Sequence, residues 1–320
     1  MSQPALLHVV LVSYNTRELL RRCLQSLECD RGLVDAVTVV DNASADGSVE
    51  MLRADFPWVQ VDANAENPGF AVAVNRALFR RPDHHVLLLN PDTEIHPGTL
   101  ARLLAVLEGH PEAGIVGPSE AQPDSAAPGL SAGHQPSLWR VFTQYSGISR
   151  LSRDRPGIEG WSLLRGVNDD RTRQVGWVSG SCMLIRADVV RRLGPLTERW
   201  FMYAEDLEYC LRATRAGYSV WHVPGATISH HVGASSRATR AATNVMWVKS
   251  TKQFYRQEWS PTWMTYLSWR AILSVGLLSR WAATRLTPLR DTAGGAARDA
   301  RAHDLFAYAR EAWLDDWRDN

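Results

Sequence analysis

The stretch LLHVVLVSYNTRELLRRCLQSL, residues Leu6 to Leu27, decides the fold because it joins a buried strand to an amphipathic helix. Its first part, Leu6 to Val12, is continuous, apolar and rich in β-branched residues, as expected of a strand covered on both faces. Asn15 and Thr16 can cap the helix that follows. Its apolar positions recur with the 3.6-residue period and are Leu19, Leu20, Cys23, Leu24 and Leu27. The stretch therefore predicts one strand–helix unit.

The same alternation continues to residue 118. Further strands are predicted over Val37–Val40, Val59–Val61 and Val86–Leu89, with helices over Gly69–Phe79 and from Pro97 onward. Strands that alternate with helices at this spacing predict a parallel, three-layer α/β sheet. Ligands bind beyond the carboxyl ends of the strands in such sheets. These ends carry a polar rim, which consists of Ser13-Tyr14-Asn15, Asp41-Asn42, Ala63-Asn64 and Asn90-Pro91-Asp92.

The second half of the chain changes character. Residues 119–173 are rich in Pro, Gly, Ser and Arg and predict long loops with a short helix near Leu138–Gln144. Strand patterns return over residues 174–186, and helices are predicted over Ala187–Leu193 and Ala204–Ala216. Two short strands, Ser219–Val223 and Ala226–Ser229, then precede His230-His231.

Composition and missing motifs exclude several classes of protein. The four cysteines show no C-x-x-C spacing, which argues against a zinc or thiol-redox site and against a disulfide scaffold. No G-x-G-x-x-G, P-loop or G-x-S-x-G sequence occurs, which argues against dinucleotide, nucleoside-triphosphate and esterase chemistry. The N-terminus lacks the features of a signal peptide, so a cytoplasmic location is expected.

Four polar clusters could each carry chemistry, although each also has an ordinary structural explanation. Asp41 could only cap a turn, and Asn90 to Glu94 could be a proline turn or a carboxylate site for a divalent cation. Glu205 and Asp206 could be first-turn acids that the helix dipole favours. His230 and His231 could simply end a strand. The order of the clusters along the chain decides between these interpretations.

Seven blocks in that order resemble the family 2 glycosyltransferases of the bacterial rhamnosyltransferase-like branch. The blocks are VSYN (Val12–Asn15), VVDNASADGS (Val39–Ser48), ENPGFAVAVN (Glu66–Asn75), LLLNPDTEI (Leu87–Ile95), GWVSGSCMLIR (Gly176–Arg186), FMYAEDLEYCLRATRAGY (Phe201–Tyr218) and ISHHVGASS (Ile228–Ser236). The resemblance implies an α/β GT-A fold, a mixed and mainly parallel sheet with a helical C-terminal extension. We expect a catalytic domain over 1–236, with a nucleotide-binding half (1–118) and an acceptor half (119–236), and an extension over 237–320.

The resemblance also implies a donor site for a dTDP- or UDP-linked sugar. Asp41 would accept the N3–H of the base, since an ionised carboxylate only accepts hydrogen bonds. Other residues would line the nucleoside and the sugar diphosphate, and they are Ser13, Tyr14, Asn15, Asn67, Gly69, Asn75, Asn90, Trp177, Ser179 and Gly180. Trp177 could equally be a core residue.

Metal binding and proton transfer follow the same family pattern. Asp92 matches the last position of the family's D-x-D motif, whose first position is Asn90 here, so a single carboxylate is expected to bind Mg²⁺ or Mn²⁺. His230 is a second candidate ligand, with His231 as the alternative. Asp206 is the expected general base of an inverting single displacement, with Glu205 beside it.

The sugar and the acceptor remain open at this point. The Asn90-Pro91-Asp92 variant favours transfer of L-rhamnose from dTDP-L-rhamnose, while galactofuranosyl, N-acetylglucosaminyl and mannosyl transfer from UDP- or GDP-sugars stay as alternatives. The acceptor could be a polyprenyl-diphosphate-linked saccharide or a soluble saccharide. A non-catalytic nucleotide-sugar-binding scaffold is a further alternative. A nucleotidyltransferase is disfavoured, because such an enzyme would need a glycine-rich phosphate loop after the first strand and no glycine precedes Gly32.

The C-terminal extension is basic and rich in tryptophan. Residues Arg237 to Arg290 hold nine Lys and Arg residues and one acid, Glu258, although the whole chain has a net charge of +1. This pattern predicts amphipathic helices on the anionic inner face of the cytoplasmic membrane. The alternative is that the aromatic residues pack back on the catalytic domain or fill a homodimer interface. No nucleic-acid partner is expected.

Overall fold

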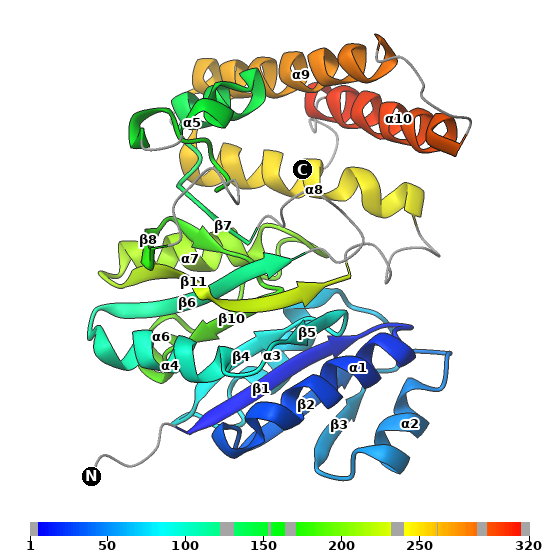
Figure 1. Ribbon diagram of the computed structural model, residues 1–320, viewed down its shortest axis with the longest axis vertical. Helices are drawn as coiled ribbons and strands as arrows, with labels where there is room; N and C mark the ends of the chain where they lie inside the picture. The colour runs from blue at the N-terminus through cyan, green and yellow to red at the C-terminus, as the bar shows by residue number, and fades with distance from the viewer. Residues whose placement is uncertain are drawn as a thin grey trace. The chain divides into compact units, whose positions relative to one another are not determined.

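A computed structural model describes residues 6–121, 131–152, 155–163, 171–231, 240–260, 262–286 and 293–314 (Figure 1). The chain divides into two compact units. The first comprises residues 1–135 and 162–238, and the second comprises residues 136–161 and 239–320. Residues 136–161, which the sequence placed in the acceptor half, thus belong with the C-terminal helices. The expected boundary at 236/237 lies outside the described residues.

The first unit contains the predicted parallel strands. They are β1 (Leu7–Ser13), β2 (Ala36–Asp41), β3 (Val59–Ala63) and β4 (His85–Leu89), which pair in the order β3-β2-β1-β4. The register aligns Ser13 with Asp41, and Asp41 with Ala63. Parallel pairing in this register brings the polar residues that follow the strands to one edge of the sheet.

The remaining strands make the sheet mixed. β10 (Cys182–Ile185) runs antiparallel to both β4 and β6 (Ala113–Ala121). β11 (Ser219–His230) lies parallel to β6 and antiparallel to β5 (Thr93–Ile95) and β8 (Arg173–Val175). A separate ribbon pairs β7 (Ala132–Gly133) with β9 (Trp177–Val178). The acidic and histidine-bearing ends of β4, β6 and β11 therefore belong to one sheet.

Helices of the first unit follow the sequence periodicity. They are α1 (Arg17–Leu27), α2 (Ser48–Asp55), α3 (Phe70–Leu78), α4 (Thr99–Gly109), α6 (Ala187–Leu193) and α7 (Glu205–Arg215), with a 3₁₀ turn η1 over Glu28–Leu33. α1 buries Leu20, Leu24 and Leu27 completely in the core that also contains β1. Burial of each such leucine contributes about 1.5–3 kcal/mol.

Four local expectations were wrong. β6 runs through Ser119 and Glu120 to Ala121, where a loop was predicted from residue 119 onward. β11 is one strand with a register shift between Val223 and Thr227, not two strands. The Thr16 side chain does not cap α1, because its hydroxyl lies 3.1 Å from that of Ser13. α4 begins at Thr99, two residues after Pro97.

The second unit is helical. It contains α5 (Leu138–Ser146), α8 (Arg240–Phe254), a π-helical turn η4 (Tyr255–Trp259), α9 (Trp263–Leu286) and α10 (Ala293–Trp313), with short 3₁₀ turns η2 (Ile148–Leu151) and η3 (Pro156–Ile158). α9 packs on α5 and α10. Trp269 is fully buried and stacks on Tyr255, with ring centroids 4.9 Å apart. Among the described residues, no helix is both long and apolar enough to span a membrane.

Two buried cationic side chains bind the backbone carbonyls at the C-terminal end of α10. Lys252 of α8 is completely buried, and its Nζ donates to the backbone carbonyls of Glu311 (3.0 Å) and Leu314 (2.9 Å). Arg270 of α9 donates from Nε to the carbonyl of Ala312 (3.1 Å) and from Nη2 to that of Trp313. The last carbonyls of a helix lack partners within the helix and carry partial negative charge. Lys252 and Arg270 therefore supply both the donors and the positive charge.

Candidate active site

Asp41 lies at the carboxyl end of β2 with one oxygen unused. Its side chain is buried, and Oδ2 accepts a hydrogen bond from the backbone N–H of Ser44 at 2.8 Å. Oδ1 is also buried and has no hydrogen-bond partner within the described part of the chain. A buried acceptor without a donor costs free energy, about 1–3 kcal/mol. Asp41 is therefore poised to accept an N–H from a ligand.

Three asparagines tie together the loops beside Asp41. Asn64 Nδ2 donates to Asn42 Oδ1 at 2.7 Å, and Asn42 Nδ2 donates to Asn67 Oδ1 at 3.1 Å. Asn42 Nδ2 also lies 3.2 Å from the Gly69 carbonyl. Sequence analysis missed Asn42 and Asn64 as site residues, although both stand in its polar rim. The network fixes the ends of β2 and β3 relative to the loop before α3.

Tyr14 and Asn15 follow β1 at the same edge. Tyr14 is exposed. Asn15 adopts a left-handed φ of 54°, donates its N–H to Ser44 Oγ (2.8 Å) and accepts from the N–H of Ala45 through Oδ1 (2.8 Å). Asparagine tolerates this conformation better than most residues. Ser13 Oγ is buried against Thr16, whereas Tyr14 and Asn15 are both exposed, and the amide oxygen of Asn15 is engaged by Ala45.

Gly69 makes a close backbone approach to Phe201. Its φ is 97°, and a Cβ added there would lie 2.5 Å from the Phe201 carbonyl oxygen. That oxygen accepts a hydrogen bond from the N–H of Phe70 at 2.9 Å. Only glycine permits both the backbone conformation and the contact. Gly69 therefore positions the segment that leads into α7.

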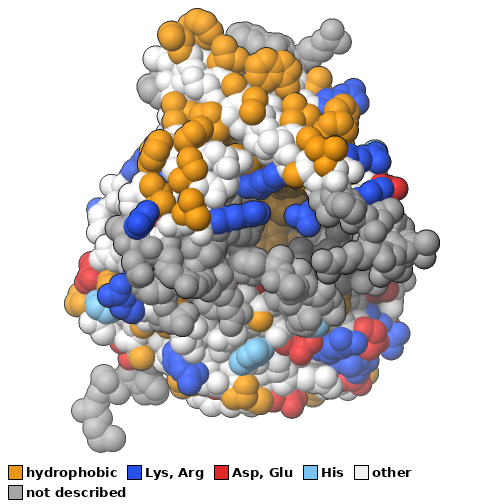
Figure 2. Space-filling view, turned by 45° about the horizontal axis from the view of Figure 1, so that its top comes forward, with side chains coloured by type: hydrophobic (Ala, Val, Ile, Leu, Met, Phe, Trp, Pro, Cys, Tyr) orange, Lys and Arg blue, Asp and Glu red, His pale blue; other side chains and the backbone are white. Residues whose placement is uncertain are grey.

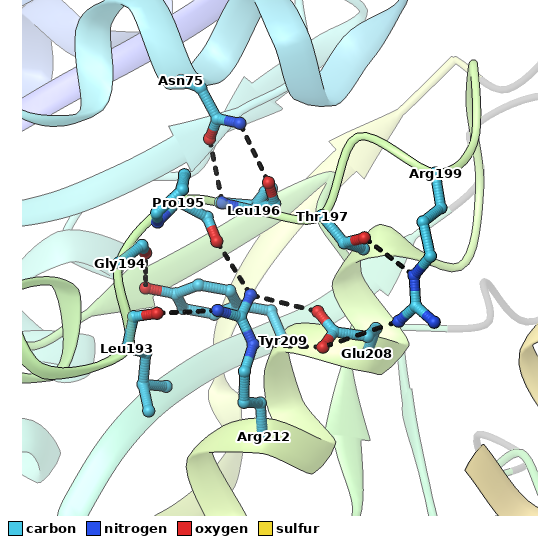
Figure 3. A network of polar contacts seen from close by, with 10 residues as sticks. All are labelled: Asn75, Leu193, Gly194, Pro195, Leu196, Thr197, Arg199, Glu208, Tyr209 and Arg212. Carbon is cyan, nitrogen blue, oxygen red and sulfur yellow. Dashed lines mark hydrogen bonds and ion pairs between the residues drawn. The ribbon is translucent and has the colours of Figure 1, made fainter. Parts of the chain in front are cut away.

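Figure 3 shows how the loop between α6 and α7 is held. Asn75 of α3 accepts from the N–H of Leu196 (2.9 Å) and donates to its carbonyl (2.9 Å) and to Glu198 (2.8 Å). Arg212 of α7 donates to the carbonyls of Leu193 (2.7 Å) and Pro195 (2.8 Å) and pairs with Glu208 (3.1 Å). The amide of Asn75 is thus engaged in holding this loop rather than directed at a donor.

The ends of β4, β6 and β11 bring Asp92, Glu120 and His230 together. His230 Nε2 lies 3.1 Å from Asp92 Oδ1, and Nδ1 lies 2.6 Å from Glu120 Oε1. Burial disfavours the charged imidazole, but its hydrogen bonds to the two carboxylates and their charges outweigh this effect and raise the pKa of His230 to about 10. His230 is therefore a cation that donates from both nitrogens.

His231 points to a different acid. Its Nε2 lies 2.9 Å from Glu94 Oε1, although its backbone N–H donates to the Asp92 carbonyl at 2.9 Å. Successive side chains of a strand alternate between its two faces. Of the two histidines, His230 is the one whose ring contacts the carboxylate of Asp92.

A divalent cation fits the chemistry of this cluster only in part. In the described ranges, no group of three or more His, Cys, Asp or Glu side chains is arranged so that it could hold a metal ion by itself. Asp92 is buried at a strand end and supplies one carboxylate. Mg²⁺ commonly takes one or two carboxylates and completes its shell with phosphate oxygens and water. The donor set fits an ion that arrives with a diphosphate.

Asp206 and Glu205 begin α7 next to this cluster. Asn90 N–H donates to the Ser181 carbonyl at 2.9 Å, and Gly180 N–H donates to Asp206 Oδ2 at 3.0 Å. The segment 180–181 therefore connects the Asp92 turn to Asp206. The residues before the helix, Tyr203 and Ala204, both have left-handed φ values, near 70°. Such strain clusters at functional sites.

The pKa values of the two acids at the start of α7 are both raised. Burial, with the Asp206 charge as the second cause, raises the pKa of Glu205 to about 8. Burial also raises the pKa of Asp206, against the opposing N–H groups of Gly180 and Leu207. Glu205 Oε2 is buried without a hydrogen-bond partner among the described residues. The two buried acids therefore lie side by side at the start of α7, and burial makes each of them bind a proton more readily than an exposed acid does.

Trp177 and Ser179 border the same segment. Trp177 is buried in β9, and the Ser179 N–H donates to the Ser131 carbonyl at 2.8 Å. Ser179 Oγ accepts from the N–H of Ser181 at 3.2 Å. Both residues support the 179–181 turn. The structure thus assembles Asp92, His230, Gly180 and Asp206 around one turn, with Glu120 as the member that sequence analysis missed.

Comparisons with known proteins agree with this geometry. Residues 4–257 match the family described as "Glycosyltransferase like family 2". The chain is 32% identical over 285 residues to an N-acetylglucosaminyl-diphospho-decaprenol L-rhamnosyltransferase of Mycobacterium tuberculosis, which covers 85% of this chain and 91% of that protein. It is 28% identical over 101 residues to the rhamnosyltransferase WbbL of Escherichia coli, which covers 29% and 38%.

Solved structures show the same fold. A mannosyltransferase from Pyrobaculum calidifontis, in complex with GDP-Man and Mn²⁺, superposes with a TM-score of 0.57 at 17% identity over 96% of this chain and 84% of that one. TarS of S. aureus, residues 1–349, gives a TM-score of 0.50 at 14% identity over 96% and 90%. These likenesses confirm the GT-A fold that the sequence predicted.

Proposed function

The chain belongs to the family 2 glycosyltransferases, and from that premise we propose that it transfers L-rhamnose from dTDP-L-rhamnose to a polyprenyl-diphosphate-linked saccharide. The observation that carries the proposal is the 32% identity to a rhamnosyltransferase with such an acceptor over 91% of that protein's length. The enzyme class, a glycosyltransferase, follows from the family. The sugar and acceptor are inferred from that relative.

Asp41 is the residue proposed to select the base of the donor. Its free, buried Oδ1 matches the single N3–H of thymine or uracil. The asparagine network would hold the surrounding loops still, so that little ordering is needed when the nucleotide binds. Replacing the carboxylate by an amide, Asp41→Asn, removes one acceptor and should weaken nucleotide binding.

We propose that Asp92 holds Mg²⁺ or Mn²⁺ together with the donor diphosphate, with His230 beside it. When bound, the ion would offset charge on the departing diphosphate. His230 donates to Asp92 and so orients its carboxylate. As a buried cation next to that site, His230 would also attract the diphosphate.

Asp206 is the proposed general base of an inverting single displacement. The acceptor hydroxyl would attack the anomeric carbon, the bond to the diphosphate would break, and the hydroxyl proton would pass to the Asp206 carboxylate. Its raised pKa favours proton uptake at neutral pH. With a pKa of about 8, Glu205 would be protonated at neutral pH and so would not itself take the proton of the acceptor hydroxyl.

A lipid-linked acceptor would place the reaction at the cytoplasmic face of the membrane, where we propose that the enzyme acts as a peripheral protein. No described helix could span a bilayer. We propose that a surface of the protein makes this attachment.

The decisive experiment compares donors and acceptors directly. Purified enzyme with Mn²⁺ is given dTDP-L-rhamnose, UDP-galactofuranose, UDP-N-acetylglucosamine or GDP-mannose, with polyprenyl-diphosphate-N-acetylglucosamine as acceptor. We expect a disaccharide product only with dTDP-L-rhamnose, and loss of the product with Asp92→Ala. If another donor gives product, the enzyme transfers the sugar of that donor and not the L-rhamnose proposed here. Donor binding by calorimetry without any product would favour a non-catalytic scaffold.

A further inference from the structure

Helix α9 carries an apolar stripe that faces solvent. Met264, Leu267, Val275, Leu278 and Leu286 are exposed, with Val275 at 65% and Leu286 at 82% of full exposure. Buried residues Trp269, Leu273 and Leu277 lie on its opposite, packed side. α9 is thus apolar on two sides, and only one of them is covered by the second unit.

The stripe is regular. Its members are Met264, Leu267, Ala271, Val275, Leu278, Ala282 and Leu286, at successive spacings of three or four residues. The pattern repeats after eleven residues, which is close to three turns of a straight helix, so the stripe stays on one side. Over 22 residues it is roughly 33 Å long at a rise of 1.5 Å per residue. An uncovered stripe of this length marks an interaction surface.

Aromatic side chains lie on the neighbouring elements. Trp263 at the start of α9 is 73% exposed, and Trp139 and Phe142 of α5 are exposed as well. α5 packs directly on α9 through Gly276, whose added Cβ would lie 2.4 Å from Tyr145 Cβ. Figure 2 shows hydrophobic side chains gathered over the helices of the second unit, with Lys and Arg side chains beside them. Tryptophan favours the boundary between membrane and water.

The charge of these helices selects an anionic partner. α9 holds three arginines and no acid. Arg256, before the helix, and Arg285, near its end, are both exposed. Arg285 pairs with Asp299 at 3.3 Å on the surface, an interaction that water weakens. The stretch Arg237 to Arg290 as a whole has one acid against nine basic residues, of which Lys252 and Arg270 are buried against the end of α10 and do not face the surface.

We propose that the exposed stripe of α9, with the aromatic residues of α5, docks on an anionic lipid surface. A helix with Trp, Leu and Met on one side and arginines near its ends can lie in the plane of the headgroups. Basic residues near the surface add electrostatic attraction to anionic lipid. A second copy of the same surface would instead bring two strongly basic segments together, which like-charge repulsion disfavours. The inference rests on the proposed function, because docking would carry the active site to a lipid-linked acceptor.

Vesicle co-sedimentation of the full chain tests the proposal. The test compares two kinds of vesicle at low and at high salt. One kind contains phosphatidylcholine with about one third phosphatidylglycerol, and the other contains phosphatidylcholine alone. We expect binding to the anionic vesicles that decreases with salt. The double variant Val275→Glu/Leu278→Glu should lower the bound fraction at least about tenfold, since it places two like charges in the stripe. A matched control, Phe79→Glu/Ala105→Glu, adds the same charge at exposed positions of the first unit and should bind as the parent does.

A second measurement does not depend on the charged variant folding. Val275→Cys, in a Cys29→Ser background because Cys29 is exposed and the other three cysteines are buried, carries an environment-sensitive dye. Its emission should shift to the blue with anionic vesicles and stay unchanged with neutral ones. No shift, or a concentration-dependent dimer that the double variant dissociates, overturns the proposal in favour of a homodimer.

The failure of this inference can be distinguished from failure of the proposed function. The double variant should retain transfer to a soluble, short-chain diphosphate acceptor and lose transfer to the acceptor embedded in vesicles. Transfer without vesicle binding would overturn the docking surface alone. Vesicle binding without transfer from dTDP-L-rhamnose would overturn the proposed function alone.

Discussion

His230 Nδ1 lies 2.6 Å from the buried carboxylate of Glu120. The contact follows from strand register, because β6 and β11 are parallel and Ile228 is aligned with Glu120. His230 stands two residues further along and thus on the same face of the sheet as Ile228. Glu120 therefore holds the ring from one side while Asp92 holds it from the other.

Replacing Glu120 by Gln should lower the pKa of His230 below its value of about 10, because one of the two carboxylates that favour the charged ring is lost. NMR titration of the histidine resonances from about pH 5 to about pH 11 measures this change in the pKa of His230. Glu94→Gln is the matched control, since Glu94 contacts His231 and not His230. Equal His230 titration in Glu120→Gln and the parent would contradict the assignment.

Asp206→Asn should retain donor binding while transfer falls about 10²–10⁴-fold, because the amide cannot take up the hydroxyl proton. Calorimetry with the donor and initial rates of transfer measure the two quantities separately. Glu205→Gln serves as the comparison, because Gln resembles the protonated Glu205 of the parent at neutral pH. If Glu205→Gln loses transfer and Asp206→Asn retains it, Glu205 is the base.

Glu205 should also make stability depend on pH. Its pKa rises from 4.5 to about 8 on folding, so the folded state binds the extra proton between these values. Its contribution to stability is fully present below the unfolded pKa and is lost as pH rises through about 8. Glu205→Gln cannot ionise and should become more stable relative to the parent as pH rises from about 4 to about 9, a range that brackets both pKa values. Urea unfolding at the two pH values measures this, and a constant difference would show that the burial of Glu205 does not persist in solution.

Gly69→Ala should destabilise the chain by more than about 1–3 kcal/mol, the usual cost of a backbone conformation reserved for glycine. Gly69 has φ 97° and ψ 179°, and the new Cβ would meet the Phe201 carbonyl. Denaturant unfolding measures the loss. Gly109→Ala is the control, because a Cβ there meets no atom within 4 Å, and it should be neutral or slightly stabilising. Equal behaviour of the two variants would argue against the close approach at Gly69.

The parallel half of the fold could be predicted because β1, β2 and β4 are largely apolar runs and α1 and α3 have a clear period, whereas α2 was not predicted. β6 could not, since Gly117 and Pro118 interrupt its pattern. Gly117 is needed there because a Cβ would lie 2.6 Å from Val178 Cβ, a contact between segments about 60 residues apart in sequence. With β6 unrecognised, Glu120 was not seen as a strand-end carboxylate.

The candidate site shows the same division. Motif blocks pointed to Asp92, His230 and Asp206, which the structure brings near one turn. Sequence could not separate His230 from His231, because the two differ only in which acid each side chain contacts at the end of β11. It also assigned Asn75 to the donor, whereas its amide holds the loop at Leu196. The sequence around an asparagine does not show whether its side chain binds a ligand or a backbone group, since both offer the same kinds of donor and acceptor.

The buried Lys252 and Arg270 make α10 indispensable to the helices it contacts. A chain cut before Ala293 would keep both cations but lose the carbonyls of residues 311–314 that they bind. Removing α10 would take away these hydrogen-bond acceptors and expose to water the sides of α8 and α9 that it covers, which would destabilise the helical unit. Shortened versions of the protein that omit the last helix should therefore be recovered as insoluble or protease-sensitive material, and an affinity tag is better attached at the N-terminus.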